Sequence, residues 1–306
     1  MDFMDFEPLL LFALAGFCAS FVDGALGMGF GPTSSSILLG SGLSPASVST
    51  SVNIVKVATG IAAAVSHWRF GNIDRKLVLG LALPGMAGAL LGATLLSSLN
   101  GAALKPALAG LLILIGLRIL LRFARLPAPT PEQATGQSLA PTDFNRKGLH
   151  LAAACGGVTN GMIGAWGPVV TPFLLHRGLS PRYAIGSANT AEVAVASASA
   201  VSLIAAVGRG GVQLAVVVAM LVGGVIAAPV AAWAIRFIPA RPLGIAVAGL
   251  LLLTNARELV SWAGLTPWSW WFYAAIVALV ALAAATPNLT RATRRSLAPT
   301  EPSSSG

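Results

Sequence analysis

Long apolar stretches separated by short polar segments dominate this chain of 306 residues. A helix needs roughly 20 mostly apolar residues to cross a bilayer, and seven stretches of about that length predict ordinary transmembrane helices. They lie at 47–68, 77–98, 102–121, 183–207, 212–235, 242–260 and 268–286. Hydrophobic residues form 56% of the chain and charged residues 9%, with a mean hydropathy of +0.81. The pattern therefore predicts an all-α integral membrane protein.

Two further apolar stretches, at 8–40 and 149–175, are interrupted by glycines and begin two copies of one repeat. A shift of 136 residues superimposes the following pairs: Gly31-Pro32 on Gly167-Pro168, Asn53 on Asn189, and Pro106 on Pro242. Slightly upstream the shift is 137, which places Cys18 on Cys155. A duplicated unit in a very apolar chain is typical of secondary transporters, whose substrate site lies where the repeats meet.

The distribution of Lys and Arg over the loops predicts the topology, because cytoplasmic loops carry the excess. If each interrupted stretch crossed the membrane once, the two sides would carry eight and nine cationic residues. If each stretch instead dips in and returns, the counts become fourteen and three. The second arrangement places the N-terminus outside and the C-terminus in the cytoplasm. Each repeat then has one broken-helix hairpin and three crossing helices, so the repeats are inverted.

These considerations divide the chain into five parts. They are repeat 1 at 8–124, a cytoplasmic linker at 125–146, repeat 2 at 147–262, an additional transmembrane helix at 267–286, and a disordered cytoplasmic tail at 287–306. The net charge of +9 is scattered between apolar runs, which argues against nucleic acid as a partner. The two cysteines lie inside membrane segments, so neither a disulfide scaffold nor a metal or cofactor site is indicated.

The glycine-rich segments that open the two repeats are the first candidate site. Glycines at this density do not hold a regular helix, and a proline just inside a helix start is favourable. Each segment is therefore expected to form a half-helix, a break and a second half-helix whose free N–H groups bind an anion. The candidate residues are Gly27, Gly29, Gly31, Thr33 and Ser34 in the first segment, and Gly164, Trp166, Gly167 and Thr171 in the second. The alternative is that these glycines serve close helix packing.

The next helix of each repeat carries matched polar residues, Asn53 with Lys56 and Asn189 with Glu192. A spacing of three residues places each pair on one helix face. Charged groups inside a membrane usually mark a substrate or proton path. Lys56 would attract an anion and Glu192 would carry a coupling proton, or the two would form an ion pair that joins the repeats.

Asp23 matches Asn160 in the repeat, and it is either a second proton carrier or a cap on the broken helix. Cys18 and Cys155 either line a path for sulfur compounds or serve as small apolar residues.

At these residues the chain resembles the TauE/SafE family of sulfite exporters. The resemblance covers residues 8–262 and rests on three features, namely the segments Gly24–Pro32 and Gly161–Pro168, the Gly-x-Ser-Pro loops at Gly42 and Gly178, and the segment His67–Asp74. It implies transport of sulfite, organosulfonates or related small anions across the inner membrane, often by export. The chain departs from such proteins at Thr33-Ser34-Ser35-Ser36, where they tend to continue with glycine and aliphatic residues, which suggests a different anion.

Together these observations predict a multi-pass carrier of the bacterial inner membrane that exports small anions by alternating access and is coupled to protons. Its expected partners are the anion and membrane lipid, and a homodimer is left open. An intramembrane enzyme, or a membrane subunit of a redox system, is the alternative. The sequence has no paired His/Glu metal motif and no nucleophile beside a base, so the chain is not expected to be an enzyme.

Overall fold

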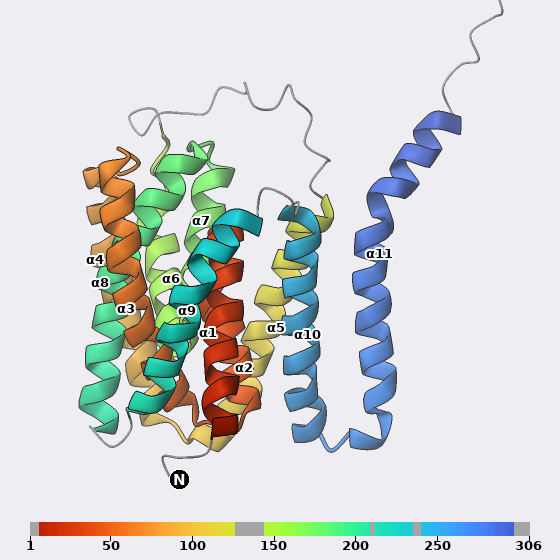
Figure 1. The fold of residues 1–306 in the computed structure, drawn as a ribbon, viewed down its shortest axis with the longest axis horizontal. Helices are drawn as coiled ribbons and strands as arrows, with labels where there is room; N and C mark the ends of the chain where they lie inside the picture. The colour runs from red at the N-terminus through yellow and green to blue at the C-terminus, as the bar shows by residue number, and fades with distance from the viewer. Residues whose placement is uncertain (1–5, 126–143, 209–211, 235–239, 297–306) are drawn as a thin grey trace, which may run out of the picture.

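A computed structural model of the chain describes residues 6–125, 144–208, 212–234 and 240–296, and within these ranges the regular structure is entirely helical. Figure 1 shows the helices as one bundle with a last helix at its edge. In chain order they are α1 (Phe6–Leu26), α2 (Phe30–Gly40), α3 (Pro45–Arg69), α4 (Arg75–Ser98), α5 (Gly101–Arg125), α6 (Leu149–Ile163), α7 (Gly167–His176), α8 (Pro181–Val207), α9 (Leu214–Ala234), α10 (Ala240–Trp262), the 3-10 turn η3 (Thr266–Trp268) and α11 (Ser269–Ser296).

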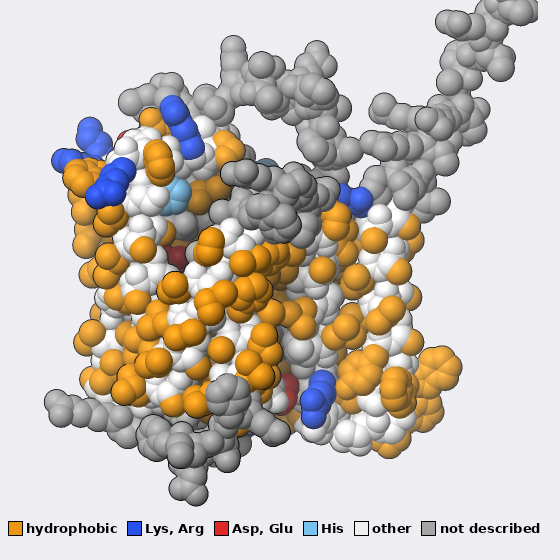
Figure 2. Space-filling model, viewed as in Figure 1, with side chains coloured by type: hydrophobic (Ala, Val, Ile, Leu, Met, Phe, Trp, Pro, Cys, Tyr) orange, Lys and Arg blue, Asp and Glu red, His pale blue; other side chains and the backbone are white. Residues whose placement is uncertain are grey.

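Seven of the described helices are long and apolar enough to cross a membrane, as the sequence predicts. They are α3, α4, α5, α8, α9, α10 and the segment Thr266–Thr286, which comprises η3 and most of α11. Large apolar side chains such as Leu79, Leu114 and Val225 are well exposed on their outer faces. Figure 2 shows this apolar coat over the middle of the bundle. Such a surface suits lipid, which solvates apolar side chains as the bundle interior does.

The two interrupted stretches are helical hairpins with a break between their halves. Gly27–Gly29 separate α1 from α2, and Gly164–Trp166 separate α6 from α7. Gly27 and Gly164 have φ angles of 66° and 68°, in the left-handed region that glycine enters without steric cost. Pro168 stands in the first turn of α7, where its missing N–H costs no helical hydrogen bond. The broken helices predicted from sequence are therefore present.

The helices pair in a pattern that repeats when the two halves of the chain are exchanged. The most extensive packing joins α4 to α6 and α1 to α9, and these two pairs correspond if α1–α5 match α6–α10. The pairs α3 with α8 and α5 with α10 each join corresponding helices. Among the described helices, α11 packs mainly on α10 and lies at the edge of the bundle (Figure 1).

Glycines let the corresponding pairs approach closely. A Cβ on Gly88 or Gly92 of α4 would collide with the backbone of α6, and a Cβ on Gly16 of α1 or Gly223 of α9 would collide with the backbone of the other helix of that pair. Small residues at helix contacts are the usual means of tight packing in membranes. These four glycines lie outside the two glycine-rich segments and serve close packing of the helices.

The hairpins enter the bundle from different ends. In Figure 1, α1 begins at the lower end, beside the N-terminus, and α2 leads back toward it, whereas α6 begins at the upper end and α7 leads back there. Figure 2 shows Lys and Arg side chains mainly at the upper end. The helix α11 continues to Ser296, although the sequence predicts a disordered tail from residue 287. Most of the predicted linker, at 126–143, and the segment 297–306 lie outside the described residues.

Candidate functional site

A small, largely enclosed cavity lies where the two hairpin breaks meet α3 and α8. Its volume is about 10 Å³, which is room for about one water molecule. Both halves of the chain contribute to its wall. The lining residues are Asp23, Gly27, Gly29, Phe30, Gly31 and Lys56 from the first half, and Gly164, Gly167, Pro168, Asn189 and Glu192 from the second. Nine of the fourteen candidates named from sequence are in this set. The role of each in binding stays a prediction.

Lys56 of α3 is the centre of the contacts that join the halves. Its Nζ atom forms an ion pair with Glu192 Oε1, and it donates to Asn160 Oδ1 at 2.9 Å and to the Gly164 carbonyl at 2.7 Å. The Lys56 side chain is 6% exposed and that of Glu192 is 18% exposed. An ammonium group has three N–H donors, so all three are used. Of the two alternatives, this conformation contains the ion pair between the repeats.

Asn53 also stabilises the junction between the two halves, although it does not line the cavity. Its Nδ2 donates to the Ser49 carbonyl at 2.9 Å, and its Oδ1 accepts from Asn160 Nδ2 at 2.7 Å. Asn160 Nδ2 also donates to Ser199 Oγ at 3.1 Å. All of these side chains are buried, and a buried amide that is fully hydrogen-bonded stabilises one arrangement.

Asn160 is the most connected residue that was not named as a candidate from sequence. Its match with Asp23 was the only available signal, because the repeat marks a position but not the partners that it meets. Ser199 has no comparable signal in the repeat.

Asp23 belongs to the last turn of α1, and its side chain reaches the start of α2. Its Oδ1 accepts a hydrogen bond of 3.3 Å from the N–H of Phe30, the first residue of that helix. A carboxylate in this place satisfies a free N–H group and interacts favourably with the positive end of the helix dipole. Of the two roles considered for Asp23, the structure contains the cap, and the anion-binding end of α2 is already occupied by a carboxylate of the chain itself.

The start of α7 differs, because among the described residues no side chain from outside the helix caps it as Asp23 caps α2. The N-cap residue, Trp166, makes no side-chain cap, and the first turn has no acidic residue. The indole of Trp166 is fully buried and donates to the Ala188 carbonyl at 3.1 Å, which anchors the break onto α8. Gly167 then lines the cavity. Pro168 has no N–H and Val169 N donates to the Trp166 carbonyl at 3.1 Å, so the N–H of Gly167 and the positive end of the helix dipole are what favour an anion at this helix start.

The glycines of the two breaks serve packing as well as lining the cavity. A Cβ on Gly31 would collide with the carbonyl group of Gly164, and a Cβ on Gly164 would lie 2.6 Å from Val52 Cγ1. The hairpins therefore cross backbone against backbone. A side chain at either position would separate the hairpins, so the two interpretations of these glycines are compatible.

The hydroxyl candidates lie beside the cavity, and none of them is in its wall. Ser34 Oγ is used within α2, where it donates to the Phe30 carbonyl at 2.6 Å. Thr33 Oγ1 and Thr171 Oγ1 are buried and have no hydrogen-bond partner among the described residues. A buried hydroxyl without a partner costs free energy, so these two groups gain from any rearrangement that brings them an acceptor.

Other residues singled out in the sequence lie away from the cavity. Cys18 and Cys155 are free and exposed on the outer faces of α1 and α6, which is contrary to the idea that they line a path. No group of three or more His, Cys, Asp and Glu side chains converges within the part of the chain that the structure describes.

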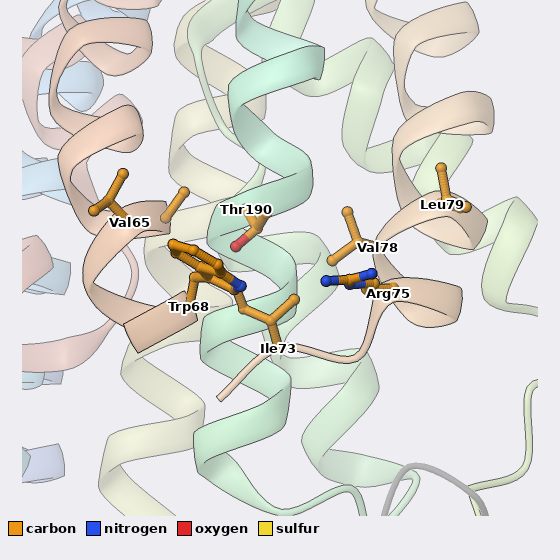
Figure 3. A pocket seen from close by; sticks show the side chains of 8 residues that line it. Val65, Trp68, Ile73, Arg75, Val78, Leu79 and Thr190 are labelled. Atoms are coloured by element: carbon orange, nitrogen blue, oxygen red, sulfur yellow. The ribbon is translucent and has the colours of Figure 1, made fainter. Parts of the chain in front are cut away.

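The segment His67–Asp74 comprises the end of α3 and the turn that leads into α4. Asp74 accepts from Leu77 N at 2.5 Å and so caps α4, and its own N–H donates to Ser187 Oγ at 3.0 Å. Figure 3 shows the groove beside this turn, where Trp68 and Ile73 face Thr190 of α8. The walls of the groove are apolar. The hydrogen bond from Asp74 N to Ser187 therefore joins the turn between α3 and α4 to α8.

These features define a class of protein. Two broken helices that meet near the middle of a multi-pass α-helical bundle, with charged residues buried at their junction, are the architecture of secondary transporters.

The sequence comparisons agree with this class. The family described as sulfite exporter TauE/SafE matches residues 12–257, and the chain belongs to this family. It is also similar to the probable membrane transporter protein YtnM of Bacillus subtilis (strain 168), with 39% identity over 259 residues that cover 83% of this chain and 84% of the relative. No solved structure matches the chain significantly. The chain is thus a membrane transporter, as the sequence predicts.

Proposed function

We propose that the protein carries a small anion, such as sulfite or an organosulfonate, and that the anion binds between the two hairpin breaks. The observation that carries this proposal is the uncapped start of α7, which faces the same cavity as Lys56. A helix start offers N–H donors and a positive dipole end, and an ammonium group adds a full charge. Both attract an anion and repel a cation.

The size of the cavity supports transport by alternating access. A cavity of about 10 Å³ has no room for an oxyanion, so the hairpins have to separate before one enters. The backbone contact between Gly31 and Gly164 closes the junction in this conformation. Rocking of one half against the other would open it to one side of the membrane at a time.

Inverted repeats follow from the same proposal. The helix pairing is preserved when the halves are exchanged, and the two hairpins return to different ends of the bundle (Figure 1). The excess of Lys and Arg supports an orientation in which the upper end in Figure 1 faces the cytoplasm of a bacterial cell, with the N-terminus outside and the C-terminus inside. Export is the direction that the family description suggests.

The ion pair supports coupling of the anion to a proton. All three donors of Lys56 are used, one of them by Glu192. Protonation of Glu192 would remove its negative charge and release one donor of Lys56 to an incoming anion. The coupling proposal is tested with Glu192→Gln, which is expected to abolish the pH dependence of transport. If the pH dependence of this variant matches that of the wild type, the proposal is wrong.

The function is tested by uptake of labelled sulfite, sulfate and a simple sulfonate into proteoliposomes. Saturable flux of one anion is expected, and Lys56→Ala and the double variant Gly29→Ala/Gly31→Ala are expected to lose it. Gly40→Ala is a matched control, because a Cβ on Gly40 meets no atom within 4 Å. Absence of flux for every anion under either pH gradient would contradict the proposal. Visible absorbance of a bound heme or quinone would instead favour the redox alternative.

A further inference from the structure

A second polar cavity lies beside the first, in a cleft between α5 and α7. Its volume is about 540 Å³, against about 10 Å³ for the central cavity, so it is large enough for a sulfonate-sized anion. The lining residues are Met28, Arg118, Ile119, Arg122, Arg125, Pro168, Pro172, Leu175 and His176. The cleft opens at the ends of α5 and α7 that the preceding proposal assigns to the cytoplasmic side.

Three arginines form one row along this cleft. Arg118, Arg122 and Arg125 are spaced by four and three residues on α5, which places them on one helix face. Among the residues that the structure describes, no acidic residue lines the cleft, and the ion pairs involve other cations. Arg118 lies seven residues before the end of α5, or about 10 Å into the bundle. An arginine at such depth inside a membrane protein usually faces water or a functional cavity.

The cleft and the central cavity share a wall. Pro168 lines both of them. Met28, from the break between α1 and α2, lines the cleft and is only 3% exposed. Arg122 Nη1 lies 3.2 Å from Met28 Sδ, and a Cβ on Gly167 would lie 3.2 Å from Met28 Cβ. Met28 is therefore wedged between the arginine row and the uncapped start of α7.

We propose that this arginine cleft is a second anion site, at which the transported oxyanion collects before it reaches the central cavity, and that Met28 is the side chain that closes the passage between them. The inference rests on the proposed function and deepens it. Guanidinium groups that have no acidic partner among the described residues raise the local concentration of anions in a recess and bind oxyanions through paired N–H donors. A hairpin movement that withdraws Met28 would connect the cleft to Gly167.

The cleft is tested first without any transport measurement. In a Cys18→Ala/Cys155→Ala background, His176→Cys provides one thiol in the cleft, because His176 is exposed and lines it. Methanethiosulfonate reagents that carry a sulfonate or a trimethylammonium group probe the charge around this thiol. The sulfonate reagent is expected to react at least about fivefold faster, and the preference should weaken with added salt. It should disappear in Arg118→Gln/Arg122→Gln and persist in Arg257→Gln, whose arginine lies near the other end of the bundle.

Labelling in two kinds of vesicle distinguishes a transported anion from an anionic lipid headgroup as the occupant of the cleft. Labelling is repeated in vesicles of phosphatidylcholine alone and in vesicles that also contain phosphatidylglycerol, with and without the transported anion. Protection by the anion in both vesicles supports the proposal. A preference that is abolished by phosphatidylglycerol and not affected by the anion would assign the cleft to lipid and overturn it. Equal labelling by the two reagents in the wild-type cleft would also overturn it.

Transport supplies the second readout. Arg118→Gln/Arg122→Gln is expected to raise KM by about tenfold or more while the maximal rate changes less, because two charges are removed from the approach path. Arg257→Gln should leave both constants unchanged. An unchanged KM in the double variant, beside an intact sulfonate preference in the wild type, would remove the cleft from the transport path and overturn the proposal. If wild-type protein labels as expected but transports no anion, the function proposed above fails and the anion site stands.

Discussion

The two hairpin breaks lie at matching positions of the sequence repeat, and the helices that follow them begin in different ways. In the first break Asp23 folds back onto its own hairpin and caps α2 at Phe30 N. In the second, the corresponding Asn160 reaches across to Asn53 and Lys56 of the other half, and among the described residues no side chain caps α7 as Asp23 caps α2. The first break thus places a carboxylate at the start of its second helix, and the second break does not.

The helices α3 and α8, which follow the two hairpins, also differ at matching positions. Lys56 of α3 and Glu192 of α8 occupy matching positions with opposite charges. An exact copy would have placed two like charges together at the junction, which is unfavourable in a low-dielectric interior. Because the two matching residues carry opposite charges, Lys56 and Glu192 form an ion pair at the junction. This comparison teaches that the repeat preserves the backbone framework, while the site depends on the positions where the two copies differ.

The largest effect is expected when the charged pair is broken. Lys56→Met would leave Glu192 without its partner and would free Asn160 Oδ1 and the Gly164 carbonyl. Removal of one member of a buried ion pair typically costs about 3–5 kcal/mol. Thermal unfolding of the detergent-solubilised protein, followed by size exclusion, measures the loss.

The double variant Lys56→Met/Glu192→Met separates stability from function. It should recover part of the lost stability, because no buried charge is then left without a partner, but it should not transport. Unchanged stability in Lys56→Met would show that the pair does not hold the halves together, and the comparison would lose its central contact.

The crossing of the breaks is tested next. Gly31→Ala introduces a Cβ that collides with the Gly164 carbonyl, whereas Gly40→Ala at the end of the same helix meets no atom within 4 Å. Overpacking of this kind costs about 1–3 kcal/mol, so Gly31→Ala should unfold at lower temperature and transport little. Gly40→Ala should behave like the wild type in both measurements. Equal behaviour of the two variants would mean that the hairpins are not in backbone contact.

The difference between Asp23 and Asn160 can be probed by exchanging the side chains singly. Asn160→Asp adds a carboxylate at Lys56 and close to the proposed anion site, and a repulsion of about 1.4 kcal/mol would raise KM about tenfold. Asp23→Asn keeps a hydrogen-bond acceptor at α2 and loses only the charge, with an expected loss of about 0.3–1 kcal/mol.

Anion uptake at a series of concentrations measures the first variant, and thermal unfolding measures the second. A KM in Asn160→Asp equal to that of the wild type would place the anion elsewhere.

Hydropathy and the repeat predicted the seven crossing helices, the two breaks and a charged junction made by Lys56 and Glu192. These features depend on local composition or on matched positions, and both can be read along the chain. The positions of Asn53 and Ser34 could not be predicted in the same way. A spacing of three residues correctly placed Asn53 and Lys56 on one face of α3. The short Asn53 side chain contacts Asn160 of α6, whereas the longer Lys56 side chain reaches the cavity.

The hydrogen-bond partner of Asp23 and the cleft lined by Arg118, Arg122 and Arg125 could not be predicted from the sequence either. Asp23 was identified as a cap or a proton carrier, and only the fold of the hairpin selects Phe30 N as its partner. Arg122 and Arg125 were counted as evidence of orientation, because nothing in the sequence brings α5 beside α7. Contacts between distant segments decide these roles.

The smallest effect is expected at the matched cysteines, where the two halves have not diverged. Cys18 and Cys155 occupy corresponding positions and are both exposed on the outside of the bundle, so Cys18→Ala/Cys155→Ala should change stability by less than about 0.5 kcal/mol. Uptake of sulfite by this variant should equal that of the wild type, and wild-type uptake should resist membrane-permeant thiol reagents. A several-fold loss of uptake without a loss of stability would show that sulfur chemistry on the outer face takes part in transport. Residues outside the breaks would then also take part in transport, at positions where the two halves carry the same residue.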